Sequence, residues 1–324
     1  MTVSEIQAFL GEDWNRVRTL LQESLHSDVE LLDRTNASLL ANGGKMLRPM
    51  LSLLVSKACG GSGDECIRVA VASELLHNAT LLHDDVLDGG QCRRGAPTVL
   101  STLGAKPSVL IGDFWLVKTM TTVLHCGEHF REVSDLFART EQDLVEGELL
   151  QMAKAASGDT SEEDYMRIIY LKTASLFQTI CSSAALVAEA PASYAQAAKE
   201  YGRLLGMAFQ IKDDIMDYEG GPLGKPAGAD LKEGQITLPL LGTLRKLDAA
   251  REKEIRQMVS ALPQQPGTFA EVSEMVRKLE GIEYARIRLE DFVRQAKEAL
   301  RALPDSQPKI CLLQLADYCT YRTI

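Results

Sequence analysis

The 324-residue sequence predicts an all-α fold, a single large helical bundle that spans residues 1–324. Long segments rich in Ala, Leu and Glu run between short clusters of Gly and Pro, and this composition favours helices over sheets. Aromatic residues make up only 6% of the chain, and no segment shows sustained alternation of apolar and polar residues. We expect roughly ten or more helices, joined by loops at the Gly and Pro clusters.

The expected loops divide the chain into helical segments in order. Gly readily adopts the backbone conformations of tight turns, and Pro interrupts helices. The strongest helical pattern lies between two of these loops, where apolar residues recur every three or four positions from Ile67 to Val86. The Gly and Pro clusters lie at residues 42–44, 60–63, 89–97, 104–107, 190–191, 220–228 and 263–267.

Composition and charge exclude several classes of function. The formal net charge is −10 and no basic stripe is present, which argues against a nucleic-acid partner. The seven cysteines form no C-x-x-C pair, so we expect reduced thiols instead of a zinc site or a disulfide framework. No apolar stretch approaches the ~20 residues of a membrane span, and the N-terminal residues lack the pattern of a signal peptide. The sequence therefore predicts a soluble, cytoplasmic protein without a membrane span.

Two acidic clusters of the form D-D-x-x-D each end a helical segment. In each cluster the first and last aspartates lie one turn apart on one helix face, where like charges repel and the helix dipole disfavours anions. A bound cation would remove both costs, and Mg²⁺ prefers oxygen ligands that it shares with water and substrate phosphates. A solvated acidic face is the alternative, and it explains two clusters less well than one. The clusters are Asp84, Asp85 and Asp88, and Asp213, Asp214 and Asp217.

Polar or small residues precede each cluster on the same helix face. The first helix is therefore expected to bury one side and to line a polar space with the other. The glycines before the second cluster indicate either close helix packing or space for an apolar chain, because Gly otherwise weakens a helix by ~1 kcal/mol. These residues are His77 and Thr80 before the first cluster, and Gly202, Gly206 and Gln210 before the second.

Basic residues lie close to the acidic clusters and at the start of one helix. Helix N-termini with a Gly-rich approach, such as the segment at 43–49, bind phosphate through their N–H groups and dipole. Basic side chains pair with phosphate oxygens, so these cations and the two acidic clusters together predict a site for diphosphates. The sequence contains no G-x-x-x-x-G-K-[ST] motif, which argues against ATP chemistry. The cations are Lys45, Arg48, Arg93, Arg94, Lys172 and Lys225.

As an ordered set, these motifs resemble the polyprenyl synthetase family, the trans-isoprenyl diphosphate synthases. The match extends along almost the whole chain and is highly specific as a set. It comprises G-G-K-x-L-R-P at 43–49, L-L-H-N-A-T-L-L-H-D-D-V-L-D at 75–88, R-R-G-x-P-T at 93–98, G-D-F at 112–114, K-T-A at 172–174, F-Q-I-K-D-D-I-M-D at 209–217, G-K-P-A-G-A-D-L at 224–231 and E-G-Q-I-T-L-P at 233–239.

The resemblance implies an isoprenoid synthase bundle with a central active-site cavity, in which isopentenyl diphosphate is condensed onto an allylic diphosphate. Asp84 and Asp88 would hold two Mg²⁺ ions on the allylic diphosphate and Asp213 a third, with the other aspartates of the clusters, Asp85, Asp214 and Asp217, in support. Isopentenyl diphosphate would be bound by Lys45, Arg48, His77 and Arg94. The allylic diphosphate would be neutralised by Arg93, Lys172 and Lys225, and the developing cation would be faced by Thr173 and Gln210.

Two positions depart from the family pattern. The family usually has Arg where this chain has Met46, and we expect little effect from that change. It usually has Lys in the E-G-K-x-T-L-P motif, where this chain has Gln235. That lysine would contact the allylic diphosphate, so its loss could weaken ionisation unless Lys225 suffices.

Product length is predicted from the residues about one turn before the first cluster. In the family a bulky aromatic residue there ends chain growth, whereas this chain has Ala79 and Thr80. We therefore expect a long all-trans product, hexaprenyl or longer. Helix geometry favours Thr80, one turn before Asp84, over Ala79, which points roughly 140° away. A deeper wall could come from Phe114, Trp115, Leu116 and Met120.

Three other functions compete with this prediction. The same reaction could give geranylgeranyl or farnesyl diphosphate. A terpene cyclase also uses D-D-x-x-D, but it usually has a different second motif and needs no isopentenyl site. A regulatory subunit of a heteromeric synthase commonly lacks an aspartate cluster, and this chain has both. The family is usually dimeric, so we expect a homodimer.

Overall fold

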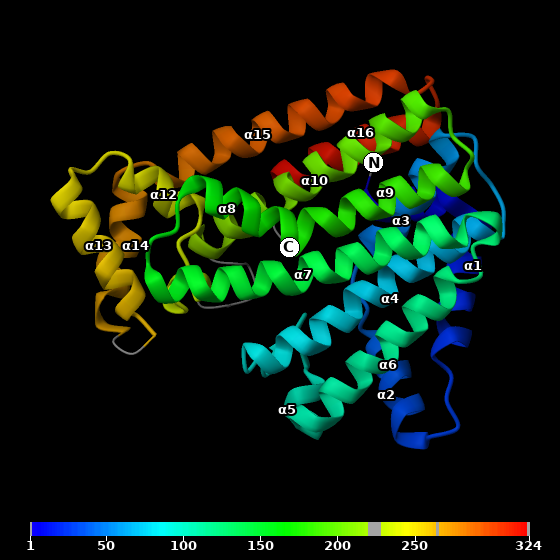
Figure 1. The fold of residues 1–324 in the computed structure, drawn as a ribbon, viewed down its shortest axis with the longest axis horizontal. Helices are drawn as coiled ribbons and strands as arrows, with labels where there is room; N and C mark the ends of the chain where they lie inside the picture. The colour runs from blue at the N-terminus through cyan, green and yellow to red at the C-terminus, as the bar shows by residue number, and fades with distance from the viewer. Residues whose placement is uncertain (1, 220–227, 264–265, 323–324) are drawn as a thin grey trace. The chain divides into compact units, whose positions relative to one another are not determined.

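The computed structural model describes residues 2–219, 228–263 and 266–322, and within them the chain is almost entirely helical (Figure 1). The strands in the described residues are β1 (Cys92–Arg93) and β2 (Ala96–Pro97), which pair antiparallel. They form a short hairpin within the loop expected at 89–97. The all-α prediction is confirmed.

The helices divide into two compact units. Unit 1 comprises Met1–Ala138, Thr179–Lys199 and Ala302–Gln314, and unit 2 comprises Arg139–Gln178, Glu200–Arg301 and Leu315–Ile324. The single domain predicted for residues 1–324 stays a prediction. No helix in the described ranges has the length and apolar character needed to cross a membrane.

The first half of the chain contains mostly long α-helices. Each is bounded by a loop, and most of these loops contain Gly. In chain order they are α1 (Val3–Leu25), α2 (Glu30–Ala41), α3 (Leu47–Ala58), α4 (Asp64–Leu87), α5 (Val99–Leu103), α6 (Ala105–Val123), the 3₁₀ turn η1 (Gly127–His129) and α7 (Phe130–Ser157).

The described residues of the second half are also helical, with one π-helical segment and two 3₁₀ turns. In chain order the elements are α8 (Glu162–Ile169), the π segment η2 (Tyr170–Ala174), α9 (Ser175–Val187), α10 (Ala192–Glu219), α11 (Ala229–Lys232), α12 (Leu238–Leu244), α13 (Ala249–Ala261), η3 (Pro266–Thr268), α14 (Phe269–Lys278), α15 (Gly281–Ala299), η4 (Leu300–Ala302) and α16 (Gln307–Tyr321).

Helix α4 is central to the core of unit 1, where it packs against α3 and α6. Its apolar stripe is buried from Ile67 to Leu82, as the periodicity predicts. Gly112 in α6 permits the close approach of α4, because a Cβ atom at this position would lie 2.3 Å from His83 Nε2. The glycine of the G-D-F motif therefore leaves room for the His83 ring between α4 and α6.

In unit 2, glycines allow two helices to pack closely against the π segment η2. A Cβ atom at Gly206 of α10 would lie 2.5 Å from the Ala174 Cα atom, and one at Gly147 of α7 would lie 2.8 Å from Leu171 Cβ. Of the two explanations for a glycine at position 206, close packing is therefore correct. Single-turn π segments are frequent at functional sites, and this one includes Lys172 and its neighbour Thr173.

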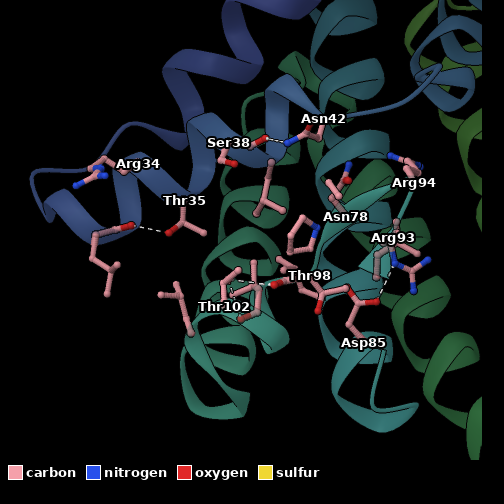
Figure 2. Close-up of a pocket in the computed structure, with 18 of the residues that line it drawn as sticks. Arg34, Thr35, Ser38, Asn42, Asn78, Asp85, Arg93, Arg94, Thr98 and Thr102 are labelled. Atoms are coloured by element: carbon pink, nitrogen blue, oxygen red, sulfur yellow. Dashed lines mark hydrogen bonds and ion pairs between the residues drawn. The ribbon is translucent and has the colours of Figure 1, made fainter. Parts of the chain in front are cut away.

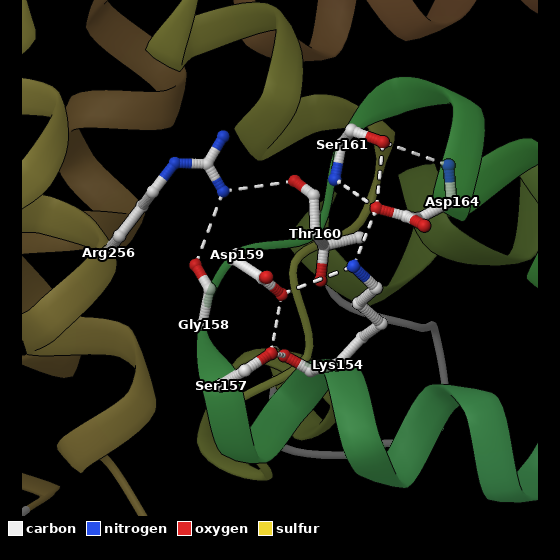
Figure 3. A network of polar contacts seen from close by, with 8 residues as sticks. All are labelled: Lys154, Ser157, Gly158, Asp159, Thr160, Ser161, Asp164 and Arg256. Carbon is white, nitrogen blue, oxygen red and sulfur yellow. Dashed lines mark hydrogen bonds and ion pairs between the residues drawn. The ribbon is translucent and has the colours of Figure 1, made fainter.

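A polar network fixes the start of α8 in unit 2 (Figure 3). The Ser161 hydroxyl accepts a 3.0 Å hydrogen bond from the Asp164 N–H, and Asp164 accepts one of 3.0 Å from the Ser161 N–H, which is a capping box. Lys154 Nζ lies 2.9 Å from the same carboxylate, and Arg256 donates to a carbonyl of the preceding loop at 2.9 Å. The Ser161 N–H and the Lys154 ammonium lower the Asp164 pKa to about 2. This network orients the first turn of α8, which includes Tyr165.

Candidate active site

The first acidic cluster lies at the C-terminal end of α4 in unit 1. The Asp88 N–H donates to the Asp84 carbonyl at 2.9 Å, so the two outer aspartates lie one helical turn apart, as predicted. Asp85 differs from them, because it is buried and its Oδ1 accepts a 2.9 Å bond from Arg93 Nε. In this structure Asp85 anchors the hairpin that follows α4.

The hairpin and the loop before α3 bring the two predicted arginine and lysine segments of unit 1 together. A Cβ atom at Gly44 would lie 2.8 Å from the Arg94 guanidinium, so this side chain lies directly against the loop, and the φ of 66° at position 44 favours glycine. Arg94 has a φ of 53° and Met46 a φ of 49°, a left-handed conformation that is uncommon for residues other than glycine. Backbone strain of this kind often occurs at ligand-binding sites. The loop that contains Lys45 thus lies against the arginine hairpin.

His77 lies in α4, within electrostatic range of three of the predicted arginines. Burial lowers its pKa well below the usual 6.5, and Arg48, Arg94 and Arg93 lower it further, in that order. Three of the predicted diphosphate-binding cations are therefore close enough to act on one imidazole. The predicted isopentenyl diphosphate residues of unit 1 are brought together, with a neutral His77 among them.

Glu74 is a buried carboxyl group one turn before Asn78, and the sequence patterns did not single it out. The Asn78 side chain donates to Glu74 Oε1 at 3.0 Å. Burial raises the Glu74 pKa, whereas Asn78, Arg48 and Arg94 lower it. The pKa of Glu74 is raised overall, and two of the predicted phosphate-binding arginines lie within electrostatic range of this buried carboxyl group. An isolated glutamate in an apolar helical run gives no sequence signal of this proximity.

The hairpin borders a cavity of about 700 Å³ in unit 1, between α2, α4 and α5 (Figure 2). Arg93, Arg94, Asp85 and Asn78 lie along one side of it, and Arg34 of α2 along another. Ligand pockets typically occupy about 300–1,000 Å³. The Asp85–Arg93 ion pair is therefore adjacent to open space, and the hairpin is accessible to a small ligand.

The second acidic cluster lies near the C-terminal end of α10 in unit 2. Asp214 is buried and accepts two hydrogen bonds, one of 2.6 Å from the Tyr165 hydroxyl and one of 2.9 Å from Gln210 Nε2. The Thr173 hydroxyl donates to Gln210 Oε1 at 2.7 Å. Burial raises the Asp214 pKa to about 7, despite these donors. Thr173, Gln210 and Asp214 are thus brought together, whereas sequence reasoning missed Tyr165.

The outer aspartates of this cluster contact other groups. Asp213 Oδ1 lies 2.7 Å from Nη2 of Arg322, the residue that follows α16. Asp217 Oδ1 accepts a 2.9 Å bond from the Ala229 N–H, which ties the start of α11 to the cluster. Neither contact was expected from the sequence, because both partners lie far along the chain.

Two predicted cations of unit 2 remain, Lys172 and Lys225, together with Gln235 at the position where the family usually has lysine. Lys172 Nζ lies 2.5 Å from the Glu148 carboxylate of α7, an ion pair that the sequence analysis did not anticipate. Lys225 lies outside the described residues. Gln235, the departure from the family pattern, donates to Glu233 at 2.8 Å. Its side chain therefore has a local hydrogen-bond partner in place of a phosphate.

The predicted chain-length residues lie in α4 with different accessibility. Ala79 has 0% of its surface exposed, whereas Thr80 is half-buried and donates to the His77 carbonyl at 2.8 Å. Only Thr80 thus has surface that a ligand can touch. In α6, Trp115 is fully buried and bonded to Asn36 at 2.9 Å, and the other three candidates, Phe114, Leu116 and Met120, are half-buried.

The carboxylates of the first acidic cluster, Asp84 and Asp88, have a donor set that suits a metal ion. Within residues 2–219, 228–263 and 266–322, no three His, Cys, Asp or Glu side chains form a ready metal-binding group. Mg²⁺ commonly binds through only one or two carboxylates and completes its shell with waters and substrate phosphates. Asp84 and Asp88, one turn apart at a helix end, supply that donor set, so the residues fit Mg²⁺ that is shared with a diphosphate.

Comparisons with known proteins agree with the motifs. The family model described as polyprenyl synthetase matches residues 29–276. The octaprenyl diphosphate synthase of Haemophilus influenzae is 35% identical over 318 residues, which cover 98% of this chain and 96% of that protein. The match therefore extends over both sequences almost completely.

Solved structures show the same likeness at the level of the fold. A decaprenyl diphosphate synthase from Rhodobacter capsulatus has a TM-score of 0.92 and 33% identity, and covers 100% of both chains. A polyprenyl synthase from Caulobacter crescentus, solved in complex with calcium and isoprenyl diphosphate, also has a TM-score of 0.92, with 31% identity and coverage of 100% of this chain and 98% of that one.

Proposed function

Because this chain belongs to the polyprenyl synthetase family, we propose that it is a trans-prenyltransferase that condenses isopentenyl diphosphate onto an allylic diphosphate and makes a long all-trans product. One observation supports this most directly. The Lys45 loop, the Arg93–Arg94 hairpin and a neutral His77 come together in unit 1 as a cationic group suited to a diphosphate. The octaprenyl and decaprenyl synthases among its relatives support the long product.

Isopentenyl diphosphate would bind to the cations of unit 1. Lys45, Arg48 and Arg94 would pair with its phosphate oxygens, since guanidinium groups bind them in a fork. Neutral His77 would add a hydrogen bond without a further charge. Glu74 would orient Arg48 and Arg94 from below, because it is buried and close enough for both to shift its pKa.

The allylic diphosphate would be held by Mg²⁺ together with basic side chains. Asp84 and Asp88 would hold two ions and Asp213 a third, and the Caulobacter crescentus relative, solved with calcium and isoprenyl diphosphate, supports a divalent ion. When bound, Mg²⁺ would neutralise the negative charge of the diphosphate leaving group. Asp85, Asp214 and Asp217 would act in support, through the contacts described above.

Lys172, Arg93 and Lys225 would complete the neutralisation of the leaving diphosphate. Lys172 and Arg93 both have carboxylate partners in this structure, Glu148 and Asp85. These pairs hold the two cations in fixed orientations before a substrate arrives, which lowers the cost of reorganisation. The diphosphate would then share or replace those partners.

Cleavage of the carbon–oxygen bond of the allylic substrate would give a carbocation and free diphosphate. The isopentenyl double bond would attack the carbocation, and the released diphosphate would accept the proton that is then lost. Thr173 and Gln210 would direct oxygen atoms toward the positive charge. Because Gln210 Nε2 donates to Asp214, its carbonyl oxygen is fixed on the side of Thr173. The Thr173 hydroxyl uses its proton in the bond to Gln210, which leaves its lone pairs for the cation.

We also propose that two copies of the chain associate through α6. Three apolar residues at intervals of seven, Leu110, Val117 and Leu124, are exposed along this helix and its C-cap, a spacing typical of paired helices, and Leu103 at the end of α5 is exposed beside them. Their exposed fractions are 67% for Leu110, 62% for Val117 and 55% for Leu124, against 36% for Leu103. Sedimentation should give a dimer for the wild-type chain and a monomer for Leu110→Glu combined with Val117→Glu. A wild-type monomer would disprove this arrangement.

Product analysis tests the proposed reaction. The purified chain is incubated with Mg²⁺, labelled isopentenyl diphosphate and farnesyl diphosphate, and the dephosphorylated products are resolved by length. A ladder that ends at hexaprenol or longer is the expected result. An end at farnesol or geranylgeraniol would keep the reaction and reject the long product.

The absence of incorporation with any allylic primer would contradict the proposed reaction for the chain alone. Gln235→Lys would then show whether the missing family lysine is responsible, because it restores a cation beside Glu233. Activity in that variant would assign the defect to position 235. Continued inactivity would favour a regulatory subunit.

A further inference from the structure

Arg322, which follows the last helix, has a buried side chain that contacts the second acidic cluster. Its side chain is 5% exposed, and its Nη2 atom lies 2.7 Å from Asp213 Oδ1. The same nitrogen donates to the Phe209 carbonyl at 2.9 Å. A cation from the end of the chain therefore neutralises the carboxylate that, under the proposed function, holds the third Mg²⁺ ion.

The aromatic ring of Phe209 forms the other side of this binding place. The guanidinium carbon of Arg322 lies 3.8 Å from the ring centroid, a short cation–π distance. Phe209 is itself fixed against Phe177, with ring centroids 5.3 Å apart. Arg322 thus has a preformed binding place on α10, composed of an aromatic face, a carbonyl and a carboxylate.

The Arg322 side chain is bound to Asp213 and Phe209 through only part of its guanidinium group, which allows it to dissociate from Asp213. Among the described residues, both side-chain hydrogen bonds of Arg322 use Nη2, and its Nε has no hydrogen-bond partner. Side-chain exposure differs across the pair, since Asp213 is 39% exposed and Arg322 only 5%. A metal ion can therefore reach the carboxylate from its open side and displace the guanidinium from the other.

We propose that Arg322 is a resident counter-ion of Asp213, which competes with the divalent ion for that carboxylate. This inference rests on the metal-binding role of Asp213 in the proposed function. A guanidinium bonded to one carboxylate oxygen opposes a second cation on the same group by charge repulsion. Metal binding and Arg322 docking therefore exclude one another, and arrival of the metal releases the C-terminal end of α16 from α10.

Metal titration of the full chain without substrate tests the competition. Free Mn²⁺ is followed by electron paramagnetic resonance, with Arg322→Gln, Arg322→Lys and wild type compared. Arg322→Gln removes the competing charge and should tighten Mn²⁺ binding roughly three- to tenfold. Arg322→Lys keeps the charge but loses the stacking of a planar guanidinium on Phe209, so its Mn²⁺ affinity should lie between those of wild type and Arg322→Gln.

A matched control distinguishes local competition from a change in net charge. Arg286 lies in the same unit and pairs with Glu219 at the end of α10. Arg286→Gln removes one charge without touching Asp213, and Mn²⁺ affinity should change by less than about twofold. In an Asp213→Asn background, Arg322→Gln should lose its effect, because the contested carboxylate is absent.

A second measurement follows the chain itself. In wild type, Mn²⁺ with inorganic diphosphate should increase amide hydrogen exchange in residues 315–322, because docking of Arg322 is lost. Circular dichroism of each variant confirms that it is folded, and Arg322→Lys keeps the charge if Arg322→Gln is unstable.

Three outcomes are decisive. Tighter binding in Arg322→Gln that depends on Asp213 supports the inference. Unchanged or weaker binding in that variant, with normal binding in wild type, overturns the inference and leaves the proposed function intact. An Asp213→Asn variant that binds Mn²⁺ as wild type does overturns both the inference and the metal role of Asp213.

Discussion

Tyr165 of α8 donates a 2.6 Å hydrogen bond to Asp214 of α10, and this bond separates the middle aspartate of the second cluster from its neighbours. Asp214 is buried, whereas Asp213 and Asp217 are half-buried. The bond also extends to Gln210 and Thr173, so that one hydrogen-bonded chain runs from a tyrosine to the residues proposed to face the carbocation. Asp214 therefore orients other side chains and has few lone pairs left for a metal ion.

Tyr165→Phe is expected to lower kcat about tenfold with little change in either KM, because the loss of one donor loosens Gln210 without touching the phosphate-binding cations. The free energy of unfolding should fall by about 1–3 kcal/mol, since a buried carboxyl group loses a partner. Steady-state kinetics and urea unfolding measure both effects. Tyr194→Phe, a change on the half-buried tyrosine of α10, is the matched control. A normal kcat in Tyr165→Phe would reject the orienting role.

The pKa of Asp214, about 7, predicts a dependence of stability on pH. Because the folded pKa lies above the usual 3.8, the native state holds this proton more tightly than the unfolded chain does. The resulting stabilisation is present below about pH 4 and is lost as the pH rises through about 7. Urea unfolding at about pH 5 and about pH 8 should therefore show a larger loss of stability in wild type than in Asp214→Asn.

Other groups also titrate between about pH 5 and pH 8. The contribution of Asp214 is therefore measured as the difference in pH-dependent stability between wild type and Asp214→Asn. Asp230 of α11 is one of them, because burial raises its pKa as well, with Asp214 and Asp217 adding to the shift. Asp230→Asn alone should keep part of the wild-type slope. Equal slopes in wild type and Asp214→Asn would contradict the assignment to Asp214.

His77 is expected to act as a neutral hydrogen-bonding group. Burial and the neighbouring arginines lower its pKa well below 6.5, so its protonation should produce no inflection in the KM for isopentenyl diphosphate between about pH 6 and pH 8. His77→Gln should keep that KM within about threefold, whereas His77→Ala should raise it about tenfold through the lost bond. An inflection near pH 6.5 that disappears in His77→Gln would show that the charged form binds.

The fold followed from sequence patterns that depend on local physics. Helix periodicity between residues 67 and 86 predicted a buried stripe, and that stripe is buried in unit 1 as far as Leu82. Loop positions followed from Gly and Pro in the same way. Such signals are local, and no comparable pattern predicted the hairpin of β1 and β2, whose strands have two residues each.

The candidate site was predictable where local motifs mark it, at the two acidic clusters and at the basic segments beside them. Two D-D-x-x-D clusters identified the aspartates, but their roles depend on partners distant in sequence. Arg322 lies 109 residues from Asp213, and Tyr165 lies 49 residues from Asp214. No sequence pattern distinguishes Tyr165 from other tyrosines or Arg322 from other arginines. Only the packing of the helices shows that these residues contact the second acidic cluster.

Asp84 and Asp85 are adjacent in sequence, but their replacement should affect different kinetic constants. Asp84→Asn removes a proposed metal ligand and should lower kcat roughly a hundredfold or more and raise the Mg²⁺ concentration required. Asp85→Asn removes the carboxylate that holds Arg93 and should mainly raise the KM for the allylic diphosphate. Kinetics over a range of Mg²⁺ separate the two, with exposed Asp135→Asn as control. Identical profiles for the two variants would contradict the separate role of Asp85.

Thr80 is expected to influence product length more than Ala79 does. Thr80 has accessible surface, so Thr80→Tyr can extend into open space and should shorten the product at nearly unchanged Tm. Ala79 is 0% exposed, and a tyrosine there would overpack the core, at a cost of about 1–3 kcal/mol, so Ala79→Tyr should lower Tm whatever its product. Thr80→Val loses the bond to the His77 carbonyl but keeps the volume, and it should give the wild-type product. Chain-length analysis and thermal unfolding of the three variants test this. An unchanged product from Thr80→Tyr would show that chain growth is limited elsewhere.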